Sequence, residues 1–321
     1  VVGSTLRNAG ITTPMFVAED MLTAFTVQPM IQYCVADPHA RQYIGAISVH
    51  GYSDGVNPIP TSDAAQAWGG TRGIASYGVA QGLPVWQTEM SGFHDSWYGG
   101  STGGWQAGSK PGAWRLAQAV YTALKYGKVE LFCYWVLSSY NSWDEGFSLI
   151  WNGNKTREYY IMKNFARYIR PGAVQLGSSS DDDYVHELVY RHPVDNTITV
   201  VLLNTSDAGK TVSIAGSDVP SQLQAHRSSE DENCVGIGSV SSQSIQLPAK
   251  SITTLVGDGY SPTAVGRQRA LPTQRLVPYT GDRRTFGLDG RLRRALDTPG
   301  RMLVPGVYVI GAARGGTVAW R

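Results

Sequence analysis

The chain has 321 residues, a formal net charge of +2, 42% hydrophobic residues and only 16% charged residues. This hydrophobic content can form buried cores and excludes wholesale disorder, and the length allows two or three domains. The low charge disfavours nucleic-acid binding, which needs dense Lys and Arg contacts to phosphate, and no apolar run approaches the roughly 18 residues that span a bilayer.

Four short apolar runs near the start of the chain each predict a buried strand. They cover residues 14–18, 44–49, 83–88 and 129–135, and the gaps between them leave room for helices. Repetition of strand and helix at this spacing predicts a parallel sheet with crossover helices. Four such units amount to half of a (β/α)8 TIM barrel, whose complete form has about 250 residues.

Two helices have clear signals in the sequence. One follows Pro111, where apolar residues recur at helical spacing over residues 113–124. The other is predicted over about 157–169, and Pro171 ends it.

The composition changes after residue 172, which predicts four parts. Residues 1–172 form the partial barrel, whereas residues 173–257 have short β-rich runs separated by Asp, Asn, Gly and Ser turns, typical of a β-sandwich. Residues 258–280 are rich in Pro, Arg and Gln and predict a linker. Residues 281–321 carry two turn-flanked β signals, and their scattered arginines do not form the aligned face that nucleic acid requires.

Polar and aromatic residues gather where the predicted strands end. The carboxyl ends of parallel strands meet at one face of a barrel, and active sites form there. The residues at or just beyond these ends are Glu19, His50, Tyr52, Glu89, Trp135, Tyr140 and Trp143. Retaining glycoside hydrolysis needs two carboxyl groups about 5–5.5 Å apart. The Gly-rich loop 91–110, with Trp97, is also predicted to contact a sugar, because loops at this face carry specificity.

Four segments in order resemble family 30 of the glycoside hydrolases. They are residues 48–52 (SVHGY), 85–92 (VWQTEMSG), 163–172 (KNFARYIRPG) and 247–255 (LPAKSITTL). The resemblance covers about residues 1–257 and implies strands five to eight of the barrel followed by a side β-sandwich. Members of this family are retaining enzymes that act on xylans, β-1,6-glucans, β-1,6-galactans and glucosylceramides.

The resemblance implies a role for each matching residue. Glu89 matches the catalytic nucleophile, and Trp135 matches a residue that stacks on the sugar. His50 and Tyr52 match substrate-side positions. Further substrate-binding candidates are Glu19, Trp97, Tyr140 and Trp143. The acid/base Glu of the family lies in an Asn-Glu-Pro turn with no counterpart in this sequence, so we expect the C-terminal half of an enzyme, inactive by itself.

These observations predict a retaining endo-glycoside hydrolase of a plant cell-wall β-glycan, with xylan or glucuronoxylan as the leading substrate. Arg157 lies where some xylan-cleaving relatives hold a glucuronate branch. The alternatives are an endo-β-1,6-galactanase or glucanase, and a non-catalytic glycan-binding protein. The reaction requires no cofactor. No metal is expected, because the cysteines and histidines lack metal-ligand spacing.

The expected partner is a polysaccharide or oligosaccharide, and neither a nucleic acid nor a membrane. Residues 281–321 resemble the C-terminal sorting modules of secreted bacterial enzymes. We therefore expect a secreted bacterial protein, monomeric at full length, although this sequence shows no signal peptide at its start.

Overall fold

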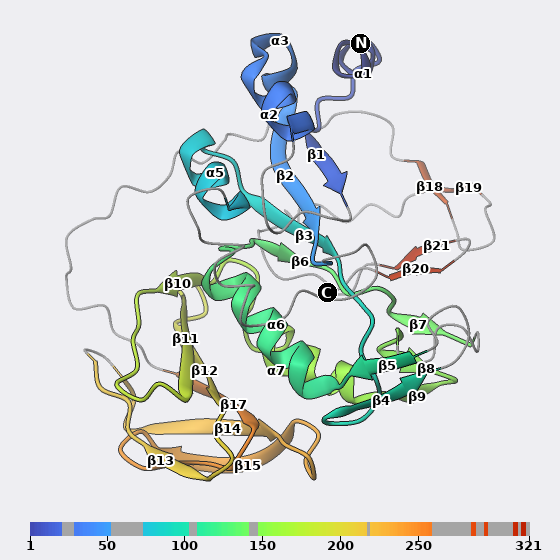
Figure 1. Cartoon of the computed structure of the whole chain (residues 1–321). Coiled ribbons are helices and arrows are strands. Elements are labelled where there is room, and N and C mark those ends of the chain that lie inside the picture. Colours follow the sequence, from blue (N-terminus) through green and yellow to red (C-terminus); the bar gives the residue numbers. More distant parts are fainter. Residues whose placement is uncertain are drawn as a thin grey trace.

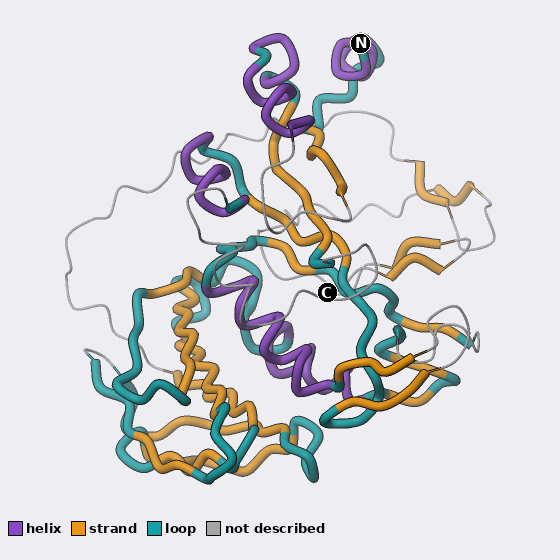
Figure 2. Tube along the Cα trace, in the orientation of Figure 1, coloured by secondary structure: helices purple, strands orange, loops and turns teal. Residues whose placement is uncertain are grey.

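Figures 1 and 2 show the computed structural model of the chain. It describes residues 1–20, 29–52, 73–102, 108–140, 147–216 and 219–258. Further on it describes the backbone of four short strands, which pair as two antiparallel hairpins: β18 (Arg284–Phe286) with β19 (Leu292–Arg294), and β20 (Gly311–Ala313) with β21 (Gly316–Val318).

A four-stranded parallel sheet forms the first half of the chain, with its strands in chain order. The strands are β1 (Met15–Asp20), β2 (Ile44–His50), β3 (Val85–Glu89) and β6 (Leu131–Phe132). Each predicted apolar run supplies one strand, but β6 is shorter than the predicted 129–135. Beyond β6 the chain still runs beside β3, since Cys133 N donates to Gln87 O at 2.8 Å and Trp135 N to Met90 O at 2.9 Å.

Helices precede, connect and follow these strands. They are α1 (Val2–Asn8), α2 (Pro29–Ala36), α3 (Pro38–Arg41), α5 (Ile74–Gln81), α6 (Ala113–Lys125) and α7 (Arg157–Ala166). Thr156 caps α7 by accepting a hydrogen bond from Tyr159 N. This helix ends at Ala166, before the predicted residue 169, and Tyr168 N then bonds Phe165 O in a tighter i→i−3 turn. Within the described residues, every helix is too short or too polar to cross a bilayer.

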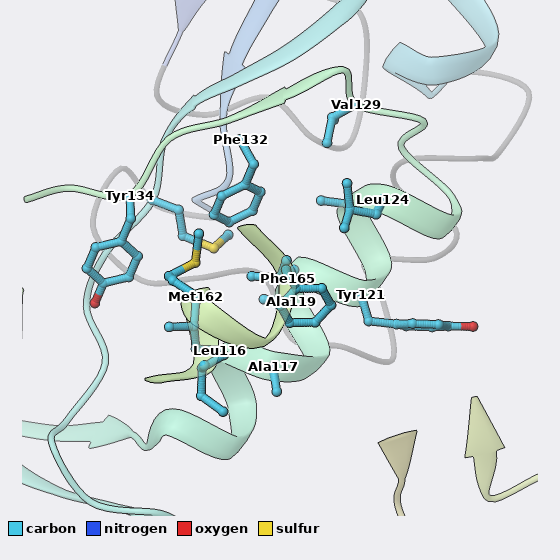
Figure 3. Close-up of a cluster of buried hydrophobic side chains, with 14 of the residues drawn as sticks. Leu116, Ala117, Ala119, Tyr121, Leu124, Val129, Phe132, Tyr134, Met162 and Phe165 are labelled. Atoms are coloured by element: carbon cyan, nitrogen blue, oxygen red, sulfur yellow. The ribbon is translucent and has the colours of Figure 1, made fainter. Parts of the chain in front are cut away.

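The main core lies between the parallel sheet and the pair of helices α6 and α7. Figure 3 shows Leu116 and Leu124 of α6, Phe132 of β6 and Phe165 of α7 directed into this cluster. Because α6 also packs against α7 and the sandwich, it is buried on more than one face. Its apolar spacing therefore predicted the helix correctly but not how completely the helix is covered.

Small strands extend the structure beyond the carboxyl ends of β3 and β6 (Figure 1). They form an antiparallel pair, β4 (Gly99–Thr102) with β5 (Gly108–Pro111), and a three-stranded group, β7 (Ser138–Ser139), β8 (Ile150–Trp151) and β9 (Asn154–Lys155).

The antiparallel β-structure predicted after residue 172 is present. Its six-stranded sheet contains, in spatial order, β10 (Val174–Leu176), β11 (Val185–His192), β12 (Thr197–Asn204), β17 (Ser251–Asp258), β14 (Gln222–Ser228) and β15 (Val235–Ser241). A second layer pairs β13 (Lys210–Val212) with β16 (Ile245–Leu247). In Figure 1, the sandwich and the parallel sheet lie on opposite sides of α6 and α7.

Strand β12 joins the two halves because its faces belong to different cores. Val200 and Leu202 pack between the layers of the sandwich, whereas Val201 and Leu203 belong to the cluster that includes α6 and α7. Side chains alternate in direction along a strand, so a strand covered on both faces is apolar throughout. This explains the unbroken apolar run of β12.

Buried hydrogen bonds fasten α7 to the sandwich. Asn164, which is fully buried, donates from Nδ2 to Ser228 Oγ at 2.6 Å, and its backbone carbonyl accepts from Thr254 Oγ1 at 2.8 Å. Such groups are costly to bury without partners, so these bonds favour one relative position of the two halves.

Candidate active site

The carboxyl ends of β1, β2 and β3 bring together Glu19, His50 and Glu89. Two irregularities in strand pairing prepare this arrangement. In β1, Glu19 is an extra residue between the pairs Ala18–Ser48 and Asp20–Val49. In β3, Thr88 is an extra residue between the partners of Val49 and His50. Such β-bulges occur next to active sites and change the direction of a side chain.

His50 lies between the two carboxylates. Its Nε2 is 2.9 Å from Glu19 Oε1, and its Nδ1 is 3.6 Å from Glu89 Oε1. The His50 side chain is 8% exposed, compared with 24% for Glu89 and 42% for Glu19. The histidine is thus enclosed, while both carboxylates remain accessible to solvent.

Glu19 is held by three further features. Thr88 Oγ1 donates to its second carboxylate oxygen at 2.8 Å, and its backbone N donates to Ser48 Oγ at 3.0 Å. Its φ of 60° is in the left-handed region, which is uncommon for residues other than glycine. The local structure therefore fixes both the backbone and the carboxylate of Glu19.

The two carboxyl groups have pKa values shifted in opposite directions. The hydrogen bond with His50 is the main reason that the pKa of Glu19 is lowered. Burial raises the pKa of Glu89, and the charge of Glu19 adds to this, whereas His50 and the nearby Tyr52 hydroxyl oppose it. Opposed shifts of neighbouring carboxyl groups are typical of acid–base sites.

Tyr52 and Trp135 complete the group around Glu89. Tyr52 is buried, its hydroxyl lies 2.7 Å from Ser91 Oγ, and its ring meets that of His50 edge to face at 6.0 Å. Burial raises the pKa of Tyr52, so the phenol stays protonated. Trp135, just after β6, is 41% exposed, and its backbone N donates to the carbonyl of Met90, the residue after Glu89.

The other predicted sugar-binding aromatics are placed differently. Tyr140 follows β7 and is 77% exposed, whereas Trp143 lies outside the described residues. Trp97 does not join the site: it is buried, stacks on Trp114 at 5.7 Å, and donates from Nε1 to Lys250 O of the sandwich at 3.1 Å. Its contacts make it a packing residue at the junction of the two halves.

Arg157 is also engaged at this junction. Its guanidinium donates to Ser229 O at 3.3 Å and Glu230 O at 2.7 Å. Both acceptors are backbone carbonyls of the sandwich. The contacts observed for Arg157 therefore stabilise the docking of the sandwich rather than present a free cation to an acidic sugar.

Sequence reasoning missed three polar residues that support the site. Thr88, Ser48 and Ser91 all lie within the motif segments, yet only their contacts reveal that they hold Glu19 and Tyr52. Gly51 has a comparable role, because a Cβ there would lie 2.3 Å from Gln87 Nε2. Glycine at this position leaves room for the ends of the Gln87 and Met90 side chains. Across the described residues, no three His, Cys, Asp or Glu side chains are grouped to hold a metal ion.

Comparison with known proteins shows what this fold resembles. Residues 172–255 match the model of the glycosyl hydrolase family 30 beta sandwich domain. No curated relative matches the chain.

Three solved structures with a similar fold lie below 25% identity. A family 30 endoxylanase from Clostridium papyrosolvens C71 is 18% identical, with a TM-score of 0.60, over 78% of this chain and 58% of that chain. The catalytic domain of family 30 xylanase C from Talaromyces cellulolyticus is 20% identical, with a TM-score of 0.57, over 79% and 54%. A conserved exported protein from Bacteroides fragilis is 14% identical, with a TM-score of 0.61, over 80% and 58%. This chain therefore spans little more than half the length of these proteins.

Proposed function

We propose that this chain belongs to family 30 of the glycoside hydrolases and that Glu89 is the nucleophile of a retaining glycosidase. The observation that carries the proposal is the position of Glu89 at the carboxyl end of β3, beside His50 and Tyr52 and partly open to solvent. The family 30 sandwich at residues 172–255 supports the same assignment.

In this reaction the Glu89 carboxylate attacks the anomeric carbon as the bond to the leaving oxygen breaks, which gives a covalent glycosyl ester. Water then hydrolyses the ester and restores the carboxylate. The nucleophile must be ionised. Burial of Glu89 opposes ionisation, and a positive charge on His50 together with the Tyr52 hydroxyl favours it.

A retaining enzyme also needs a carboxylic acid that protonates the leaving oxygen. Glu19 does not suit this role, because His50 and Thr88 bind both of its carboxylate oxygens and its pKa is lowered. We assign the acid/base role to the Asn-Glu-Pro turn of the family, which this sequence does not contain. The chain by itself is therefore expected to give no turnover on xylan or β-1,6-glucan.

The proposed substrate is a plant β-glycan met outside the cell, with xylan first and β-1,6-linked galactan or glucan second. The exposed side chain of Trp135, whose backbone pairs with Met90 next to Glu89, supports binding of a neutral sugar. Because the guanidinium of Arg157 is bound to the sandwich, it gives no support for recognition of a glucuronate branch.

Covalent labelling tests this proposal. A 2,4-dinitrophenyl 2-deoxy-2-fluoro-xylobioside has a leaving group that departs without acid assistance, so it reports on the nucleophile alone. Mass spectrometry is expected to find the sugar esterified to Glu89, and Glu89→Gln is expected to abolish labelling. Glu130→Gln, just before β6 and thus at the opposite end of the sheet, is the matched control and is expected to label normally.

The other candidate function is a glycan-binding protein that does no chemistry, which the open Trp135 surface also accommodates. Absence of labelling, combined with oligosaccharide binding that Glu89→Gln leaves unchanged, would identify this function. Robust hydrolysis of xylan by the isolated chain would instead refute our account of the acid/base residue.

A further inference from the structure

Each of the two strands that border β2 has one bulged residue near His50, and the side chains of these two residues contact each other. Glu19 is the extra residue of β1 and Thr88 is the extra residue of β3, and a 2.8 Å hydrogen bond joins their side chains. In regular strands neither residue would interrupt the pairing with β2. Both irregularities therefore serve one contact, which directs the Glu19 carboxylate onto His50.

The backbone of Glu19 supports the same conclusion. A φ of 60° at a residue with a Cβ is strained, and such strain persists where the surroundings enforce it. Here Ser48 Oγ accepts from Glu19 N at 3.0 Å and helps to fix this conformation.

The imidazole of His50 has a carboxylate oxygen facing each nitrogen, Glu19 at Nε2 and Glu89 at Nδ1. A ring nitrogen attracts a carboxylate only when it carries a proton, and neutral histidine carries one proton for two nitrogens. Only the imidazolium ion presents a proton to both carboxylates, with Nε2 at hydrogen-bond distance from Glu19 and Nδ1 at ion-pair distance from Glu89. Among the described residues, Tyr52 is a further titratable group against the ring, and burial raises its pKa and keeps it neutral.

We propose that Glu19 is a positioning residue that holds His50 as an imidazolium ion, with one ring proton directed at Glu19 and the other at Glu89. The inference rests on the proposed role of Glu89 as the nucleophile and extends it by one residue. Glu19 acts through His50: the positive charge keeps Glu89 ionised, and the Nδ1 proton orients its carboxylate. Thr88 and Ser48 hold Glu19 in place for this task.

Nuclear magnetic resonance of the ring nitrogens of His50 tests the charge state without any substrate. In the parent chain at pH 7, both nitrogens are expected to carry protons. In Glu19→Gln the amide oxygen can still accept the Nε2 proton, so the geometry is kept while the charge is lost. The pH at which His50 becomes neutral is then expected to fall. It is expected to fall less in Glu89→Gln, because Glu89 is more distant, at 3.6 Å rather than 2.9 Å.

Two further variants keep this test decisive. Thr88→Val retains the charge of Glu19 but removes its second anchor, and it is expected to lower the same titration by a smaller amount. Glu130→Gln is expected to leave it unchanged. A neutral His50 in the parent chain at pH 7, or an unchanged titration in Glu19→Gln, would overturn the proposal whether or not Glu89 reacts with sugars.

The pH profile of Glu89 labelling gives a second readout. If His50 orients Glu89, the labelling rate falls above the pH at which His50 loses its charge, and in Glu19→Gln this fall is expected at lower pH. An equal loss of rate at every pH would show a merely structural effect. No labelling in the parent chain, together with the expected His50 titration, would refute the proposed nucleophile and leave the Glu19–His50 interaction established.

Discussion

At the scale of single residues, the most unusual group outside the site is the carboxyl group of Glu158. Glu158 lies in the first turn of α7 and is fully buried, and neither carboxylate oxygen has a hydrogen-bond partner among the described residues. Burial raises the pKa of Glu158 to about 8, and the neighbouring charge of Asp95 adds to the shift. The side chain is therefore protonated at neutral pH, in a part of the core that also holds the hydroxyl of Tyr134.

This burial predicts a pH-dependent stability. Between the ordinary carboxyl range and pH 8, the unfolded chain loses the Glu158 proton while the folded chain keeps it. The free energy of unfolding is then expected to fall by about 1.4 kcal/mol per pH unit, until the folded pKa is passed. Glu158→Gln is expected to remove this slope in urea unfolding from pH 5 to 9. The exposed Glu230→Gln is the control, and an identical slope in both variants would contradict the assignment.

At the scale of elements, α7 is the part on which both halves depend. Asn164 connects it to β14 through Ser228 and to β17 through Thr254. Asn164→Ala is expected to cost about 1 kcal/mol or more, because it removes the buried donor to Ser228 Oγ, which then keeps only Cys234 N as a partner. The exposed Asn154→Ala, in β9, is expected to change stability by less than about 0.5 kcal/mol. Equal midpoints of urea unfolding for the two variants would show that the Asn164 contacts contribute nothing.

The elements also show how far sequence patterns reach. Apolar runs and helical spacing predicted three strands and α6 closely, because burial dictates both patterns. The fourth run overestimated β6, since an apolar stretch does not reveal where regular pairing stops. Parallel topology alone predicted that His50 and Glu89 would lie close together. The contact between Glu19 and Thr88 could not be predicted, because it depends on two β-bulges, and these do not change the apolar pattern of the sequence. Trp97 was predicted to contact a sugar but packs at the junction of the two halves. The sequence pattern of an aromatic loop residue is the same in both cases.

At the scale of the whole molecule, the sandwich and the parallel sheet share one core, so we expect them to unfold together. Eight of the nine tryptophans precede residue 172, and none lies within 173–257, so fluorescence reports chiefly on the first half. Leu202→Ala, inside the sandwich, is expected to cost about 2–5 kcal/mol and to lower the fluorescence midpoint. Val194→Ala, at a residue that is 85% exposed, is the control. An unchanged fluorescence midpoint in Leu202→Ala would mean that the halves unfold separately.

The two-faced strand β12 has a consequence for exchanging parts between proteins. Composition marks a boundary near residue 172, yet Val201 and Leu203 extend the core of the first half from within the second. In a chimera joined at that boundary, β12 of a different protein would pack against α6 and α7. A successful chimera must therefore take Val201 and Leu203 of β12 from the same protein as α6 and α7. The first half of the chain and the sandwich then have to be exchanged together.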